Sequence, residues 1–177
     1  MRTAFGALVL GLSLLPVAQA RTNDLPDSCG DDKVNFDVKL EKDRPLLTGP
    51  ESGKAQVVFI ETLNKVGGCF HCISTTRIGV DGAWAGANQD NSYFAISVLP
   101  GEHNLCTDVQ SKPGRLQLGM ATLTAEPGKI YYYKLKLTWN NLDGTSPYSN
   151  LELVPIGADE AKYWLKMSAL STSSAHS

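Results

Sequence analysis

KIYYYKLKLT, residues 129–138, carries the clearest structural pattern in this 177-residue chain. Its side chains alternate between two faces, as they do in a β-strand. One face holds Tyr131, Tyr133, Leu135 and Leu137, and the other holds Tyr132, Lys134 and Lys136. Such alternation is typical of an antiparallel sheet with one buried and one solvated face, so the segment predicts a long strand.

Shorter segments of the same kind lie on both sides of this strand. The pattern predicts strands at residues 56–61, 75–80, 83–86, 92–98, 103–109, 119–125 and 151–154. Asp81-Gly82 favours a two-residue hairpin turn, and Pro-Gly pairs at 100–101, 113–114 and 127–128 mark further turns. Parallel pairs would need crossovers of a dozen or more residues, and no connection offers one, so we expect antiparallel strands in an all-β fold. It is interpreted as an antiparallel β-sandwich of about seven short strands, immunoglobulin-like or transthyretin-like.

The two ends of the chain differ from this central part. Residues 1–20 have the pattern of a signal peptide: Arg2, an apolar run at 7–15, and Ala18-Gln19-Ala20 as a cleavage site. Residues 21–54 are interpreted as a partly extended leader, in which 34–40 alternate like a strand. The sandwich domain is expected at 55–170, with a short helix at 158–169 and a disordered polar tail at 171–177.

The composition excludes several function classes. The chain is 42% hydrophobic and 19% charged, with 16 basic and 18 acidic residues, which is not typical of a disordered, collagen-like or nucleic-acid-binding chain. No segment after residue 20 is apolar enough to span a membrane. Cys29 follows Pro-Asp-Ser rather than a lipoprotein motif. We therefore expect a periplasmic or secreted protein without nucleic acid, cofactor or metal.

Four cysteines in an exported chain predict disulfide bonds. Cys29, Cys69, Cys72 and Cys106 allow three pairings, among which the sequence does not decide. Alternation around Cys106 puts it on the face opposite the core, where it would attach either the 69–72 loop or the leader. We favour a bond from Cys106 to Cys69 or Cys72, with the remaining cysteine pairing with Cys29.

The segment Cys69-Phe70-His71-Cys72 also has the spacing of a redox pair or of metal ligands. A thiol–disulfide centre at Cys69 and Cys72 is an alternative, although no helix is expected there to lower a thiol pKa. A zinc site of the four cysteines, with His71 or His103 as a substitute ligand, is a third interpretation. It lacks the second Cys-x-x-Cys of zinc ribbons.

Exposed aromatic side chains are a further candidate for binding. Trp84, Tyr93, Tyr132 and Trp139 are a candidate stacking platform for a glycan or a partner protein, with His103 as an additional surface residue. His103 is otherwise interpreted as an edge histidine at the start of a strand. The sequence contains no Gly-x-Ser-x-Gly elbow and no phosphate-binding loop, so we expect no catalytic residues.

Four short motifs resemble those of a known family of exported bacterial proteins. They are Val80–Gly86 (VDGAWAG), Asn91–Phe94 (NSYF), Pro100–Cys106 (PGEHNLC) and Ala125–Tyr133 (AEPGKIYYY). The succession is similar to that of the domain of unknown function 2846 family and covers about residues 55–160. The resemblance implies an envelope β-sandwich, often lipid-anchored, with no assigned activity and no catalytic residues. This chain lacks the anchoring cysteine motif.

These observations lead to one hypothesis and two alternatives. The hypothesis is a secreted or periplasmic, non-enzymatic β-sandwich module that binds an envelope protein or serves the cell envelope. The alternatives are a thiol–disulfide redox protein that uses Cys69 and Cys72, and a glycan-binding module.

Overall fold

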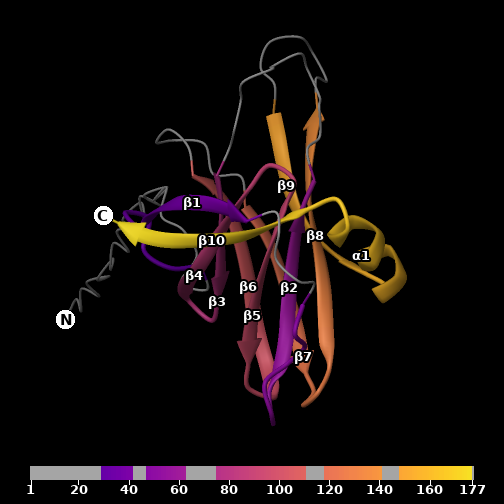
Figure 1. The fold of residues 1–177 in the computed structure, drawn as a ribbon. Helices are drawn as coiled ribbons and strands as arrows, with labels where there is room; N and C mark the ends of the chain where they lie inside the picture. Colours follow the sequence, from indigo (N-terminus) through magenta and orange to yellow (C-terminus); the bar gives the residue numbers. More distant parts are fainter. Residues whose placement is uncertain (1–28, 42–46, 63–74, 111–117, 141–147, 177) are drawn as a thin grey trace, which may run out of the picture.

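Ten strands and one short helix make up the part of the chain that the structure describes (Figure 1). The structure is a computed structural model that describes residues 29–41, 47–62, 75–110, 118–140 and 148–176. The strands are β1 Asn35–Glu41, β2 Ala55–Glu61, β3 Thr75–Val80, β4 Ala83–Gln89, β5 Ser92–Val98, β6 Gly101–Gln110, β7 Leu118–Ala125, β8 Ile130–Asn140, β9 Tyr148–Ile156 and β10 Ala169–His176. The helix, α1, spans Ala158–Leu165. The predicted signal peptide lies outside the described residues.

The strands form two sheets, which confirms the predicted all-β sandwich. The large sheet has the order β1-β10-β5-β2-β8-β9, and the small sheet has the order β4-β3-β6-β7. Most ladders are antiparallel, but β2 pairs with β8 and β10 pairs with β5 in parallel. These two pairs contradict the expectation that no connection offers a crossover long enough for parallel strands. The prediction was wrong because the chain passes through the small sheet between β2 and β8, and these strands serve as the crossover.

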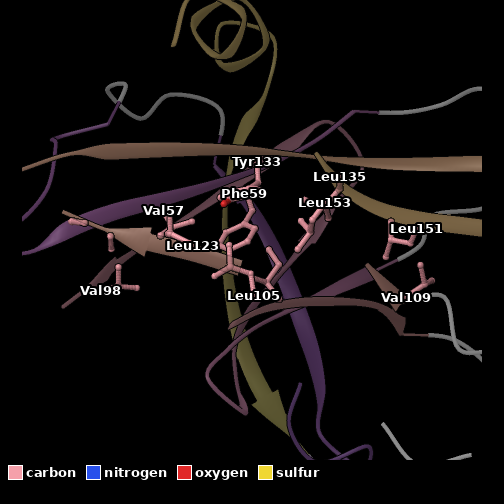
Figure 2. Close-up of a cluster of buried hydrophobic side chains, with 13 residues drawn as sticks. Val57, Phe59, Val98, Leu105, Val109, Leu123, Tyr133, Leu135, Leu151 and Leu153 are labelled. Atoms are coloured by element: carbon pink, nitrogen blue, oxygen red, sulfur yellow. The ribbon is translucent and has the colours of Figure 1, made fainter. Parts of the chain in front are cut away.

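The core lies between the two sheets and follows the alternation of the strands. Figure 2 shows side chains from both sheets pointing toward one another. The rings of Phe59 and Tyr133 are stacked, with their centroids 6.2 Å apart. The cluster contains Ala55, Val57, Phe59, Ile78, Val98, Leu105, Val109, Leu123, Ala125, Tyr133, Leu135, Leu151 and Leu153. The inner face of β8 predicted from KIYYYKLKLT is therefore confirmed for Tyr133 and Leu135.

The opposite face of the large sheet is also partly covered. Helix α1 buries Ala161 and Leu165 against Val58, Ile60 and Tyr93 of the large sheet. Tyr132 packs against this second cluster, and the Lys134 ammonium lies 3.7 Å from the ring centroid of Trp164. The predicted solvated face of β8 is therefore covered by the helix near its start, a tertiary contact that alternation along one strand does not reveal.

Two corrections concern the ends of the domain. The predicted leader contributes β1, and the predicted disordered tail forms β10 over nearly all of its length. These strands pair with each other in antiparallel register from Asn35–His176 to Glu41–Leu170. In Figure 1 the pair runs across the longer strands of the sandwich. The sandwich therefore includes both segments, and the predicted boundaries at residues 55 and 170 were wrong.

Serine side chains explain why such a polar segment forms a strand. The Ser173 hydroxyl accepts a hydrogen bond from the Ala87 N–H at 3.0 Å, and the Ser171 hydroxyl donates one to the Ala87 carbonyl. Ala87 lies on β4, an edge strand of the small sheet, whose outward backbone groups need partners. Alternate serines of β10 supply them, so the polar composition that suggested disorder is what attaches β10.

Residues 29–34, which we call the N-terminal strap, cover the outer face of the small sheet. Beneath the strap lies Arg77 of β3, whose guanidinium pairs with Asp108 of β6 and is 7% exposed. Arg77 also donates hydrogen bonds to the Asp32 carbonyl at 2.9 Å and the Val34 carbonyl at 2.8 Å. A buried guanidinium cannot lose its charge, so it requires such acceptors.

We expect Arg77→Met to destabilise the domain by about 3–5 kcal/mol, because it leaves the Asp108 carboxylate buried without its cation. The double variant Arg77→Met/Asp108→Asn removes both charges and is expected to recover part of that loss. Denaturant unfolding of the three proteins measures the difference. Equal stability of the single and double variants would show that the unpaired Asp108 carboxylate is not the source of the loss.

Candidate functional site

The Cys106 sulfur is bonded to Cys29, across a separation of 77 residues. Both cysteines are completely buried, and their Cα atoms lie 5.1 Å apart. Cys106 lies outside the core cluster that holds its neighbour Leu105, as the alternation of β6 predicted. The pairing that we favoured, Cys106 with Cys69 or Cys72, was wrong. Of the two segments considered, the leader is the one attached.

Close packing explains why the leader reaches Cys106. A Cβ atom added at Gly79 of β3 would lie 2.6 Å from the Cys29 carbonyl oxygen, so only glycine leaves room for the strap. The indole N–H of Trp84 donates to the Asp31 carbonyl at 2.8 Å. The guanidinium carbon of Arg77 lies 4.6 Å from the Trp84 ring centroid. The strap is therefore held by backbone and aromatic contacts as well as by the disulfide.

The disulfide bears directly on the metal interpretation. Cys29 and Cys106 cannot act as thiolate ligands while they are bonded to each other, so the four-cysteine zinc site was wrong. Among the described residues, no group of three or more histidine, cysteine, aspartate or glutamate side chains is arranged to hold a metal ion. Cys69, His71 and Cys72 lie outside the described residues.

The described residues that were predicted to form an aromatic platform do not share one exposed surface. Tyr93 is 3% exposed and belongs to the cluster under α1, as does the half-buried Tyr132. Trp84 lies on β4 of the small sheet, and its indole N–H donates a hydrogen bond to the strap. The side chain of Trp139 lies outside the description. The expectation of a shared surface was wrong because the large sheet carries a helix on the face where Tyr93 and Tyr132 lie.

His103 forms a small hydrogen-bonded cluster with two turns. Its Nδ1 lies 2.6 Å from Oδ2 of Asp81, and its Nε2 lies 2.7 Å from the Leu99 carbonyl oxygen. The other oxygen of Asp81 accepts the Asn104 N–H at 2.8 Å. Both partners of the ring are acceptors, an arrangement that favours the imidazolium form, in which both ring nitrogens donate. A ring whose two nitrogens are both engaged is not available as a general base.

The charges of this pair favour each other. Burial lowers the pKa of His103, but the hydrogen bond with Asp81, the Leu99 carbonyl and the Asp81 charge together raise it. Burial raises the pKa of Asp81, but its hydrogen bonds with His103 and the Asn104 N–H, together with the His103 charge, outweigh this effect and lower that pKa. The cluster therefore joins the β3–β4 turn to the β5–β6 turn.

The predicted Asp81-Gly82 turn is confirmed, and it supplies the carboxylate of this cluster. Asp81 has φ 53° and Gly82 has φ 82°, which is the left-handed conformation that a two-residue hairpin turn requires. Asp81, His103 and Cys106 belong to motifs that carried the family resemblance. In the structure each of them attaches one segment of the chain to another.

A second polar cluster, which was not predicted from the sequence, lies inside the sandwich. Glu61 ends β2, and the register places it opposite Ser92 of β5. It shares a hydrogen bond with Thr76, and Asn88 lies opposite Thr76 on β4. Glu61 follows Val57 and Phe59 at a spacing of two, so alternation would have placed this acid on the core face.

The chain was compared with family models, curated proteins and solved structures, and none of them matches. The resemblance to the domain of unknown function 2846 family therefore stays a prediction. Among the described residues, no helix is long and apolar enough to cross a membrane.

We expect the His103–Asp81 pair to make stability depend on pH. The raised pKa of the folded state means that the pair stabilises the protein fully below about pH 6.5 and loses this effect as the pH rises through that pKa. Asp81→Asn keeps a residue that tolerates left-handed φ but removes the carboxylate. Since Asp81 is half exposed, the difference is expected to be about 1 kcal/mol or less.

Denaturant unfolding of wild type and Asp81→Asn between about pH 5.5 and 9 measures this effect. Glu126→Gln, in an exposed turn, is the control and is expected to follow wild type throughout. Parallel profiles for wild type and Asp81→Asn would contradict the charged pair.

Proposed function

We propose that the protein is an exported, non-enzymatic β-sandwich module of the cell envelope that works by binding a partner protein. One observation carries this proposal: among the described residues, the candidate site residues with reactive atoms use those atoms to hold the fold. The Cys29 and Cys106 sulfurs are bonded, both His103 nitrogens have acceptors, and the Trp84 N–H is donated to the strap. A domain built in this way supports binding better than turnover.

Two features support export to the periplasm or beyond. The pattern of residues 1–20 is that of a signal peptide. A buried disulfide between distant residues is typical of proteins that fold in an oxidising compartment. The two features are independent, since one is a targeting pattern and the other is a packing contact.

Exposed apolar side chains supply the candidate contact surface. Tyr163 is 58% exposed and Met167, four residues later, is 52% exposed. Both belong to the segment around α1, which covers the large sheet. Met120 on β7 and Leu99 in the turn after β5 are exposed singly, at 51% and 66%. The pair near α1 is therefore the surface that we favour.

We expect a photoreactive phenylalanine at position 163 to give a discrete crosslinked product in the envelope of the source cells. Excess purified wild-type protein should compete for the partner and so reduce the yield of the product. Met167→Glu should also reduce this yield, because it places a charge in an apolar contact. The same probe at position 99 is the control. Absence of a product from position 163, or turnover of a defined substrate, would overturn the proposal.

A thiol–disulfide function is the second candidate, and one observation favours it. The chain has four cysteines, and Cys29 and Cys106 are bonded to each other. Cys69 and Cys72 therefore have only one another as partners within the chain. A Cys-x-x-Cys pair of this kind is the usual spacing of an exchangeable disulfide.

We expect Cys72→Ser to trap a mixed disulfide through Cys69 if this second function operates. Removal of the resolving thiol leaves a partner bound to Cys69, and non-reducing electrophoresis detects the adduct. Cys69→Ser/Cys72→Ser is the control and should trap nothing. A reduction potential well below that of thioredoxin, roughly −270 mV, together with no adduct, would dismiss the redox function.

A further inference from the structure

Glu61 and Asn88 link the two sheets at one end of the sandwich. Val57 and Phe59 of β2 point into the core, so Glu61, two residues further on, also points between the sheets. Glu61 shares a hydrogen bond with Thr76 of the small sheet. Asn88 of the small sheet donates from Nδ2 to the Phe59 carbonyl of the large sheet at 3.0 Å. Hydrogen bonds from side chains of both sheets thus link the two sheets here.

Two hydrogen-bond acceptors of this cluster lack a donor. Oε2 of Glu61 and Oδ1 of Asn88 are both buried and have no hydrogen-bond partner. A buried acceptor without a donor is costly, and two acceptors cannot bond each other without a hydrogen atom between them. A proton on Glu61 would give its carboxyl group a hydrogen atom to donate. The Asn88 amide oxygen is the candidate acceptor, because Asn88 lies opposite Thr76, with which Glu61 shares a hydrogen bond.

The surroundings also favour the neutral acid. Among the described residues that face Glu61, β3 contributes the hydroxyl of Thr76, β5 contributes Ser92, and β8 contributes Leu135 at the paired position. The β4–β5 turn contributes Asp90, whose negative charge repels a carboxylate on Glu61. Arg77, adjacent to Thr76, lies on the outer face and is paired with Asp108. Burial, aided by the negative charge of Asp90 and opposed by the Thr76 hydrogen bond, thus raises the pKa of Glu61 to about 8.

We propose that a proton held between Glu61 and Asn88 joins the two sheets at this end, and that its release acts as a pH-sensitive lock. While Glu61 carries the proton, its O–H donates to the Asn88 amide oxygen and both acceptors are satisfied. When the proton passes to solvent, the interior holds a carboxylate that faces Asp90 and an amide oxygen without a donor. The carboxylate then repels Asp90 and attracts water, which separates the two sheets at this end. The lock therefore opens as the pH rises.

The first test compares wild type with Glu61→Gln, which keeps the shape and a hydrogen donor but does not ionise. The folded acid keeps its proton above the ordinary pKa of 4.5, so wild type loses stability as the pH rises from about 4.5 to about 8. Relative to Glu61→Gln, the unfolding constant of wild type should rise by up to about tenfold for each pH unit in this window. The exposed Glu126→Gln is the matched control and should follow wild type.

The second test uses the wild-type protein and so does not depend on a variant that folds. Carboxyl-labelled glutamate gives one carbon resonance for each of the seven glutamates of the chain. We expect one of them to titrate near pH 8, well above the rest, with a simultaneous shift of the Asn88 side-chain amide signals. The proposal is overturned if all seven titrate in the ordinary range, or if wild type and Glu61→Gln keep a constant stability difference across pH.

Discussion

The buried guanidinium of Arg77 is the constraint on which the arrangement of the strap, β1 and β10 depends. Arginine keeps its charge and carries five donors, so burial under the strap requires a carboxylate and several carbonyls in defined places. Asp108 supplies the carboxylate, and the strap supplies the carbonyls of Asp32 and Val34. Once the strap lies there, Cys29 is in reach of Cys106 and β1 is directed toward β10.

Strands β1 and β10 are held by the same principle of satisfied backbone groups. Gln110 of β6 accepts the Phe36 N–H at 2.7 Å and donates to the Phe36 carbonyl at 3.2 Å, as a neighbouring strand would. Ser171 and Ser173 do the same for Ala87 at the edge of the small sheet. Polar side chains thus replace strand pairing where β1 and β10 cross from one sheet to the other.

The two titratable clusters lie at opposite ends of the β2–β5 ladder. His103 contacts the Leu99 carbonyl, just beyond Val98, which pairs with Ala55 at the start of β2. Glu61 pairs with Ser92 at the other end. In the first cluster a partly exposed carboxylate stabilises a cation, whereas in the second, burial without a cation stabilises a neutral acid. Both clusters lose their favourable protonation state as the pH rises, for opposite physical reasons.

The amino-acid sequence was enough to predict the features that depend on local alternation and turn chemistry. It predicted the all-β sandwich, the inner face of β8, the hairpin at Asp81-Gly82 and the position of Cys106 away from the core, because neighbouring residues decide these features. The tertiary structure was needed to find the partner of Cys106, the burial of Tyr93 under α1, the ordering of β10 and the hydrogen bond that Glu61 shares with Thr76. Each of these depends on contacts between residues far apart in the chain, which alternation along one strand does not encode.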